Sequence, residues 1–221
     1  MVSGGEDDVP LPEGRTEPLR DATADDLRQS AEYRRRLAPL IEGFRAGYRM
    51  TDAENEGRWF VDHGHAPTAD ELSLSCCRVG RNEAPRLMFY LDWNHLLTDE
   101  ALTANIADVW SSCDGPELRF DHDLWRDLFA RAGYTANGKP ADRPTGPLTV
   151  YRSAPPEHRA DWSWTDNRES AAKETSGEWN RRPLGRVWRA TVDPWRLLAG
   201  ITYPDEHEYV VDTDGLEIVE D

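Results

Sequence analysis

Lysine is nearly missing from this sequence. Its 26 basic residues include only two lysines, Lys139 and Lys173, and acidic residues outnumber basic ones, 42 to 26. The resulting net charge of -16 disfavours a nucleic acid as partner, because proteins that grip a phosphate backbone do so with clustered Lys and Arg.

Cysteine is scarce as well. The three present are Cys76, Cys77 and Cys113, and no Cys-x-x-Cys pair occurs, so neither a zinc knuckle nor a disulfide framework is indicated. His63 and His65 are close in sequence but lack further ligands at a metal-site spacing, and we interpret them as loop histidines. We therefore expect no metal.

Long apolar runs are also missing. No stretch approaches the roughly 20 residues that a membrane-spanning helix needs. The acidic start, Glu6-Asp7-Asp8, is unlike the basic beginning of a signal peptide. We expect a cytoplasmic protein with no membrane partner.

The periodicity divides the chain into a helical part and a strand-rich part. Residues 1–22 are rich in Gly, Pro and acid and are expected to be disordered. Residues 23–135 are expected to be mainly helical, and residues 148–221 to form a β-rich core packed with the helices as one unit. The predicted fold class is α+β.

Within the helical part, an apolar period runs over 25–48. Thr98 is predicted to cap a helix over 99–110, and Asp121 to cap another that stops at Gly133. Residues 64–85 stay unassigned. The apolar block 87–91 fits a strand or a buried helix equally well.

In the second part, residues 135–147 are typical of a linker or long loop. Asp166 is expected to cap a short helix over 170–173. Asp193-Pro194 is expected to start a two-turn helix that ends at Gly200. Strands are predicted over 148–152, 162–165, 186–192, 206–212 and 216–219.

Two glutamates, Glu206 and Glu208, lie two residues apart at the start of an apolar run. On a strand they point to the same face, where two neighbouring carboxylates repel one another. Such a pair indicates a functional site more than a stabilising one, although a solvated edge strand is the plainer alternative.

Three short motifs occur in order: Val150-Tyr151-Arg152, Ser163-Trp164-Thr165 and Glu206-His207-Glu208. With their flanks, "PLTVYR", "WSWTDNRESAA", "GRVWRATVDPWRLLA" and "DEHEYVVDTDGL", they resemble ADP-ribosyltransferases of the arginine–serine–glutamate class, and in particular a small family of high-GC bacteria or their phages. The resemblance covers about residues 96 to 217. It implies an ADP-ribosyltransferase-like split β-sheet core.

The resemblance also implies roles in cleaving NAD. Arg152 would grip the pyrophosphate with its planar fork of donors. Ser163 would support the catalytic glutamate, with Thr165 lining the cleft beside it. Glu208 would bind the ribose and stabilise the positive charge that develops there. Glu206 would orient the acceptor, an arginine side chain of a protein.

The aromatic residue that stacks on nicotinamide is not evident; Tyr151, Trp164 and Trp179 are candidates. Ser153 stands where the family often has glycine after the strand arginine, which limits close approach of the dinucleotide. Besides mono-ADP-ribosyl transfer, the residues leave open NAD hydrolysis and an inactive acidic interaction protein that keeps the fold. A DNA mimic is a weaker alternative, because the acidic residues are spread along the sequence.

Overall fold

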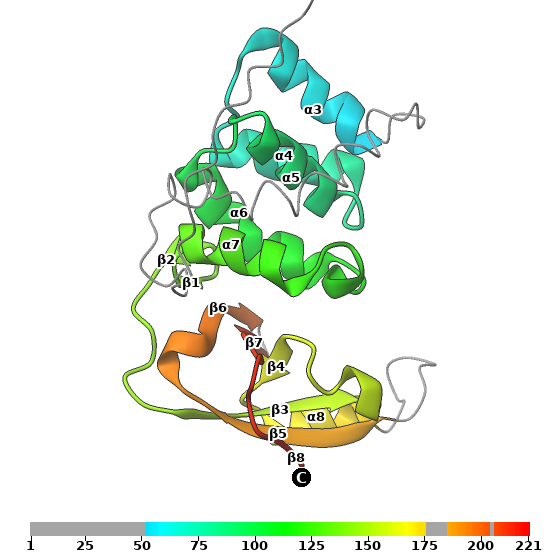
Figure 1. The fold of residues 1–221 in the computed structure, drawn as a ribbon, viewed down its shortest axis with the longest axis vertical. Coiled ribbons are helices and arrows are strands. Elements are labelled where there is room, and N and C mark those ends of the chain that lie inside the picture. Colours follow the sequence, from blue (N-terminus) through cyan, green and yellow to red (C-terminus); the bar gives the residue numbers. More distant parts are fainter. Residues whose placement is uncertain (1–51, 176–184, 204–205) are drawn as a thin grey trace, which may run out of the picture. The chain divides into compact units, whose positions relative to one another are not determined.

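The computed structural model of this chain describes residues 52–175, 185–203 and 206–221 (Figure 1). The expectations for residues 1–22, for the helix over 25–48 and for Trp179 lie outside these ranges. All of these described residues belong to one compact unit. None of the helices described in it is long and apolar enough to span a membrane.

In the described part of the chain five α-helices precede the main strands, and two of them begin as predicted. The side chain of Thr98 accepts a hydrogen bond from the Ala101 N–H, and that of Asp121 accepts one from the Leu124 N–H. The second of these helices ends at Gly133, which has a φ of 72°. The helices are α3 (Asp52–His63), α4 (Ala69–Val79), α5 (Ala84–Trp93), α6 (Asp99–Ser112) and α7 (His122–Ala132).

Most of the unassigned stretch 64–85 and all of the ambiguous block 87–91 are helical. Thr68 and Glu71 form a reciprocal capping box that starts α4. The block 87–91 belongs to α5, where Pro85 occupies the first turn, a position that tolerates its missing N–H. Its apolar residues are nearly all buried, which is why their spacing shows no amphipathic period.

The interpretation of His63 and His65 as loop histidines is wrong for His63 and confirmed for His65. His63 is the last residue of α3, and its Nδ1 lies 2.7 Å from the carbonyl oxygen of Trp59. His65 follows the helix; its Nε2 lies 3.0 Å from a Glu71 carboxylate oxygen, and its ring stacks on Phe60. Both rings thus have partners within the helical part.

The strands form an eight-stranded sheet in the order β2-β1-β6-β7-β4-β3-β5-β8. The β1–β6 pair is parallel and the others are antiparallel, so the α+β prediction is confirmed as a helical N-terminal part with a mixed sheet. The strands are β1 (Thr135–Ala136), β2 (Lys139–Pro140), β3 (Leu148–Ala154), β4 (Ser163–Thr165), β5 (Arg186–Val192), β6 (Leu197–Tyr203), β7 (Glu206–Val211) and β8 (Ile218–Glu220).

The linker prediction for 135–147 is wrong at its start. Asn137 and Gly138 have φ values of 52° and 70° and connect β1 to β2 as a tight hairpin. A Cβ at Gly138 would lie 2.5 Å from the Ala104 carbonyl oxygen of α6, so the turn packs directly on that helix.

The prediction of a two-turn helix between Asp193 and Gly200 is also wrong. Pro194–Arg196 make a single 3₁₀ turn, and β6 begins at Leu197. Residues 197–201 are buried and pair with β7 on one side and β1 on the other. Backbone pairing on both sides outweighs the helix-start signal of Asp-Pro.

A short helix, α8 (Arg168–Thr175), follows β4 as predicted, and Figure 1 shows it against β3 and β5. Its cap is Asn167 rather than Asp166. The Asn167 side-chain oxygen accepts hydrogen bonds from the N–H groups of Glu169 and Ser170.

Two clusters of buried side chains hold these elements together. One lies on the sheet and includes Val150, Trp164, Trp188 and Val211. In the other, Trp110 of α6 stacks on Trp162 with their ring centroids 5.5 Å apart, beside Trp125 and Phe129 of α7. Aromatic packing therefore fixes the start of β4 against the helices.

Candidate functional site

The three strands that carry the sequence motifs are neighbours near the middle of the sheet, in the order β7-β4-β3. Tyr151 of β3 pairs with Thr165 of β4, and Thr165 pairs with Glu208 of β7. Residues directly opposite one another project to the same face. Tyr151, Thr165 and Glu208 therefore form a row across one face.

Ser163 lies on the same face, because it is two residues from Thr165 and pairs with Val210. This places it diagonally across from Glu208, within reach of a long side chain. The Ser163 Oγ accepts a hydrogen bond from the indole Nε1 of Trp110 at 3.2 Å. An indole N–H can only donate, so the single proton of the Ser163 hydroxyl is directed elsewhere.

The hydroxyl of Thr165 is held in the same way. Its Oγ1 accepts from the main-chain N–H of Asn167 at 3.1 Å, and the residue is 6% exposed. Ser163 and Thr165 thus each accept from a fixed donor and keep one O–H to donate. Both hydroxyls are suited to support a carboxylate on this face, where Glu208 lies.

The side chain of Arg152 projects from the face of the sheet opposite Glu208. Side chains alternate along β3, and the neighbouring Tyr151 shares the face of Glu208. The guanidinium of Arg152 nevertheless reaches the start of β4. Nη1 donates to the Ser163 carbonyl oxygen at 2.6 Å and Nε to the His158 carbonyl oxygen at 3.1 Å. The strand register alone therefore does not bring Arg152 and Glu208 onto one surface.

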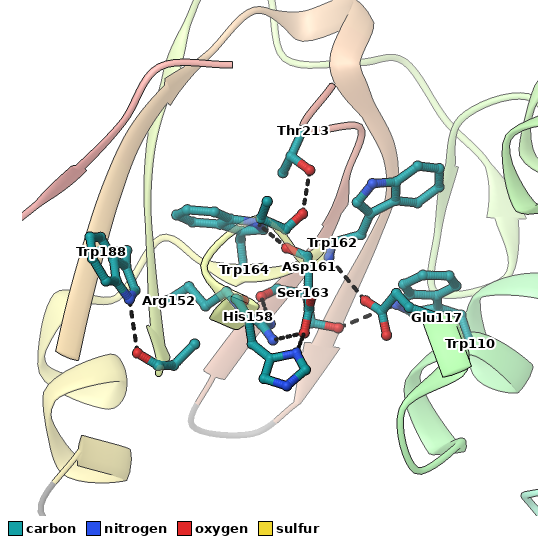
Figure 2. Close-up of polar contacts among 12 residues, drawn as sticks. Trp110, Glu117, Arg152, His158, Asp161, Trp162, Ser163, Trp164, Trp188 and Thr213 are labelled. Atoms are coloured by element: carbon teal, nitrogen blue, oxygen red, sulfur yellow. Dashed lines mark hydrogen bonds and ion pairs between the residues drawn. The ribbon is translucent and has the colours of Figure 1, made fainter. Parts of the chain in front are cut away.

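A third acceptor completes the surroundings of Arg152. Its Nη2 lies 3.0 Å from Oδ2 of Asp161, which also lies 3.2 Å from Nδ1 of His158 (Figure 2). The side chains of Arg152 and Asp161 are 17% and 24% exposed, so solvent reaches the pair from one side. The positive charge of Arg152 is thus matched by an internal carboxylate.

The other predicted residues, Glu206, Trp164 and Tyr151, differ in how accessible they are to a ligand. The main chain of Glu206 starts β7, but its side chain lies outside the described part of the structure. Trp164 is 2% exposed and donates through Nε1 to the Asp161 carbonyl oxygen, so its ring is not open for stacking on a ligand. Tyr151 is half-buried and is the better candidate for such contact.

The face opposite Glu208 carries its own polar pair on β7. His207 Nδ1 and Tyr209 Oη both lie 3.4 Å from Oδ2 of Asp166. Burial, followed by the charge of Asp166, raises the pKa of Tyr209 to about 12, so this phenol stays protonated. His207 therefore points away from the Glu208 face, as the strand alternation predicts.

A hollow of about 650 Å³ opens elsewhere, between the start of α7 and the segments at 159–160 and 213–218. None of the predicted site residues lines it. Its charged residues have both signs, Arg126 and Arg159 against Asp121, Asp123 and Asp214, so it favours no single class of ligand. No cluster able to hold a metal occurs among the residues described.

Sequence reasoning missed three residues around the motifs: Trp110, His158 and Asp161. Trp110 appears in the sequence as one member of a helical apolar stripe, which is typical of core residues. Asp161 and His158 lie in a short polar loop between predicted strands, where only the fold shows that they meet Arg152. No local signal distinguishes them.

No protein-family model matches the chain, and comparisons with curated proteins and with solved structures find no significant match.

Proposed function

We propose that this protein is a mono-ADP-ribosyltransferase that transfers ADP-ribose from NAD to an arginine side chain of another protein. The observation that carries the proposal is the register across β3, β4 and β7. Residues 57 positions apart in sequence, Tyr151 and Glu208, lie in one row through Thr165. The resemblance requires the three motif strands to be adjacent in the sheet. Their adjacency supports the proposal.

In the proposed reaction, Glu208 acts on the ribose that loses nicotinamide. Breaking that bond develops positive charge on the sugar, and a fixed carboxylate stabilises the charge as it forms. Ser163 and Thr165 share this face, and the O–H that each keeps after accepting from Trp110 or Asn167 would support the carboxylate. By the resemblance, Arg152 would contribute its guanidinium to the pyrophosphate, so NAD would have to extend past the start of β4 to the face opposite Glu208.

The test compares nicotinamide release and the transfer of labelled ADP-ribose in the wild type and in Glu208→Gln. The substitution keeps the shape of the side chain and removes its charge, so turnover should fall on the order of 100-fold or more. Asp142→Asn is a control, since it removes one carboxylate at an exposed position outside the three motif strands. Equal turnover in wild type and Glu208→Gln would refute the proposed role.

NAD hydrolysis is the second candidate, in which water takes the place of the protein acceptor. The small polar groups on the Glu208 face are compatible with it. Adding arginine-rich protein separates the two reactions: transfer accelerates nicotinamide release and labels the added protein, whereas hydrolysis does neither. Calorimetry with NAD tests the non-catalytic alternative, because an inactive interaction protein that has lost the site does not bind NAD at millimolar concentration.

A further inference from the structure

We infer that the carboxylate of Asp161 occupies the phosphate position on Arg152, and that a bound pyrophosphate replaces it there. Asp161 then sets the affinity of the site for its ligand. This inference uses the proposed function to name the ligand, the pyrophosphate of NAD, and otherwise depends on the contacts around Arg152.

Two main-chain carbonyls hold the guanidinium independently of Asp161. Nη1 donates to Ser163 and Nε to His158, at 2.6 and 3.1 Å. Because both acceptors belong to the backbone, they persist whatever happens to the Asp161 side chain. Arg152 is thus positioned before any ligand arrives, which lowers the entropic cost of binding.

Asp161 makes a different kind of contact. Its Oδ2 lies 3.0 Å from Nη2 of Arg152, on a part of the guanidinium that the two carbonyls leave uncovered. Carboxylate and phosphate oxygens accept from this fork with the same geometry. Three of the five N–H groups of the guanidinium are used in this arrangement, one each on Nε, Nη1 and Nη2. An arriving phosphate therefore meets a carboxylate already on Nη2, and the two negative charges repel one another.

The main chain on either side of Asp161 is anchored separately, as Figure 2 shows. The Trp164 indole donates to the Asp161 carbonyl oxygen at 2.8 Å, and Glu117 accepts from the Trp162 N–H at 3.0 Å. The hydroxyl of Thr213 donates to the Ala160 carbonyl oxygen. None of these contacts uses the Asp161 carboxylate, so the side chain can move off Arg152 while the loop stays in place.

His158 provides an alternative partner for the displaced carboxylate. Its Nδ1 lies 3.2 Å from the same Oδ2 that faces Arg152, on a ring that is about half exposed. Rotation of Asp161 away from Nη2 can therefore keep one polar contact. The arrangement is a carboxylate shared between a partly buried guanidinium and a solvent-facing imidazole, and a phosphate competes for the guanidinium.

Calorimetric titration of the full chain with inorganic pyrophosphate, and separately with ADP-ribose, tests the inference. Asp161→Asn removes the charge and keeps the size, so both ligands should bind about 3- to 10-fold more tightly than to the wild type. Glu157→Gln, which neutralises an exposed carboxylate in the same loop, should change the affinity by less than about 2-fold, as expected for a solvent-screened charge. Arg152→Gln should abolish binding in both the wild-type and the Asp161→Asn background.

Unchanged or weaker binding by folded Asp161→Asn would overturn the inference, since Asp161 would then position Arg152. Absence of pyrophosphate and ADP-ribose binding in all variants would overturn it too. A second measurement needs no variant at Asp161: pyrophosphate should shift the Nε–H NMR signal of Arg152 in the wild type, assigned by its loss in Arg152→Gln, and an unmoved signal contradicts the exchange.

The binding test of Asp161→Asn and the turnover test of Glu208→Gln can fail independently of one another. If wild type and Glu208→Gln release nicotinamide equally slowly, the transferase proposal fails, while tighter pyrophosphate binding by Asp161→Asn still supports the exchange. If turnover depends on Glu208 but Asp161→Asn binds no better than the wild type, the exchange fails and the transferase proposal stands.

Discussion

The indole N–H of Trp110 donates to the Oγ of Ser163 across 3.2 Å and so joins α6 to the first residue of β4. Trp110 is fully buried and stacked on Trp162, so its donor group has a fixed direction. A core residue of the helical part thereby determines which way a hydroxyl at the candidate site can donate.

Trp110→Phe should therefore lower kcat of the proposed ADP-ribosyl transfer by about 2- to 10-fold. This range corresponds to the loss of one net hydrogen bond of about 0.5–1.5 kcal/mol. KM for NAD should stay nearly constant, because Trp110 acts through Ser163. The double variant with Ser163→Ala should be no slower than Ser163→Ala alone. Additive losses in this cycle would show that Trp110 acts only through packing.

Gly138→Ala should destabilise the protein by about 1–3 kcal/mol. A Cβ there would approach the Ala104 carbonyl oxygen to 2.5 Å, and the φ of 70° disfavours any side chain. Urea unfolding measures the change in free energy. Gly146→Ala is the control, since nothing lies within 4 Å of its added Cβ, and it should be close to neutral. Equal midpoints for the two variants would contradict the packing of the hairpin on α6.

The ion pair between Arg126 and Asp212 predicts a pH dependence of stability. Nε and Nη2 of Arg126 donate to the two carboxylate oxygens at 2.8 and 3.0 Å. Burial acts to raise the pKa of Asp212, but the hydrogen bonds and charge of Arg126 outweigh it, so the pKa lies below its ordinary value of 3.8. A lowered pKa stabilises the fold above about pH 3.8, and this contribution is lost as the pH falls through the folded-state value.

Asp212→Asn should accordingly cost about 1–3 kcal/mol near neutral pH. The difference from the wild type should shrink as the pH falls from 3.8 through the lower pKa that Asp212 has in the folded state. Chemical unfolding at several pH values provides the measurement. A difference that stays constant down to the acid transition would mean that the charge on Asp212 contributes nothing.

The two adjacent cysteines should differ in reactivity. Burial, followed by the charges of Cys77 and Glu56, raises the pKa of Cys76 to about 12, whereas Cys77 is exposed. Only the thiolate reacts rapidly with a disulfide reagent. At pH 8 we expect one fast thiol in the folded protein, and Cys77→Ser should remove it. Fast labelling that persists in Cys77→Ser would place Cys76 at the surface.

The sequence predicted the elements whose signals are local. Thr98 and Asp121 start their helices as expected, because a capping side chain needs only the next turn of its own helix. The β1–β2 hairpin also has a local signal in the sequence. Asn137-Gly138 is a strong turn signal, but two-residue strands are too short to show any alternation.

Other features depend on contacts between distant segments. Residues 197–201 form a strand because β1 and β7 pair with them from both sides, which overrides the local Asp193-Pro194 signal. The row from Tyr151 to Glu208 follows from strand order, which no single motif specifies. The meeting of Asp161 with Arg152 likewise requires the turn between β3 and β4 to be known.

The order of the strands also has a consequence for synthesis. β7 is inserted between β4 and β6, yet it emerges from the ribosome about 40 residues after β4. Until then β4 presents an unpaired edge, which is able to pair with strands of other chains. A chain that terminates before β7 would lack Glu208 and carry this open edge as well. We expect such fragments to aggregate, so loss of the site and loss of solubility would coincide.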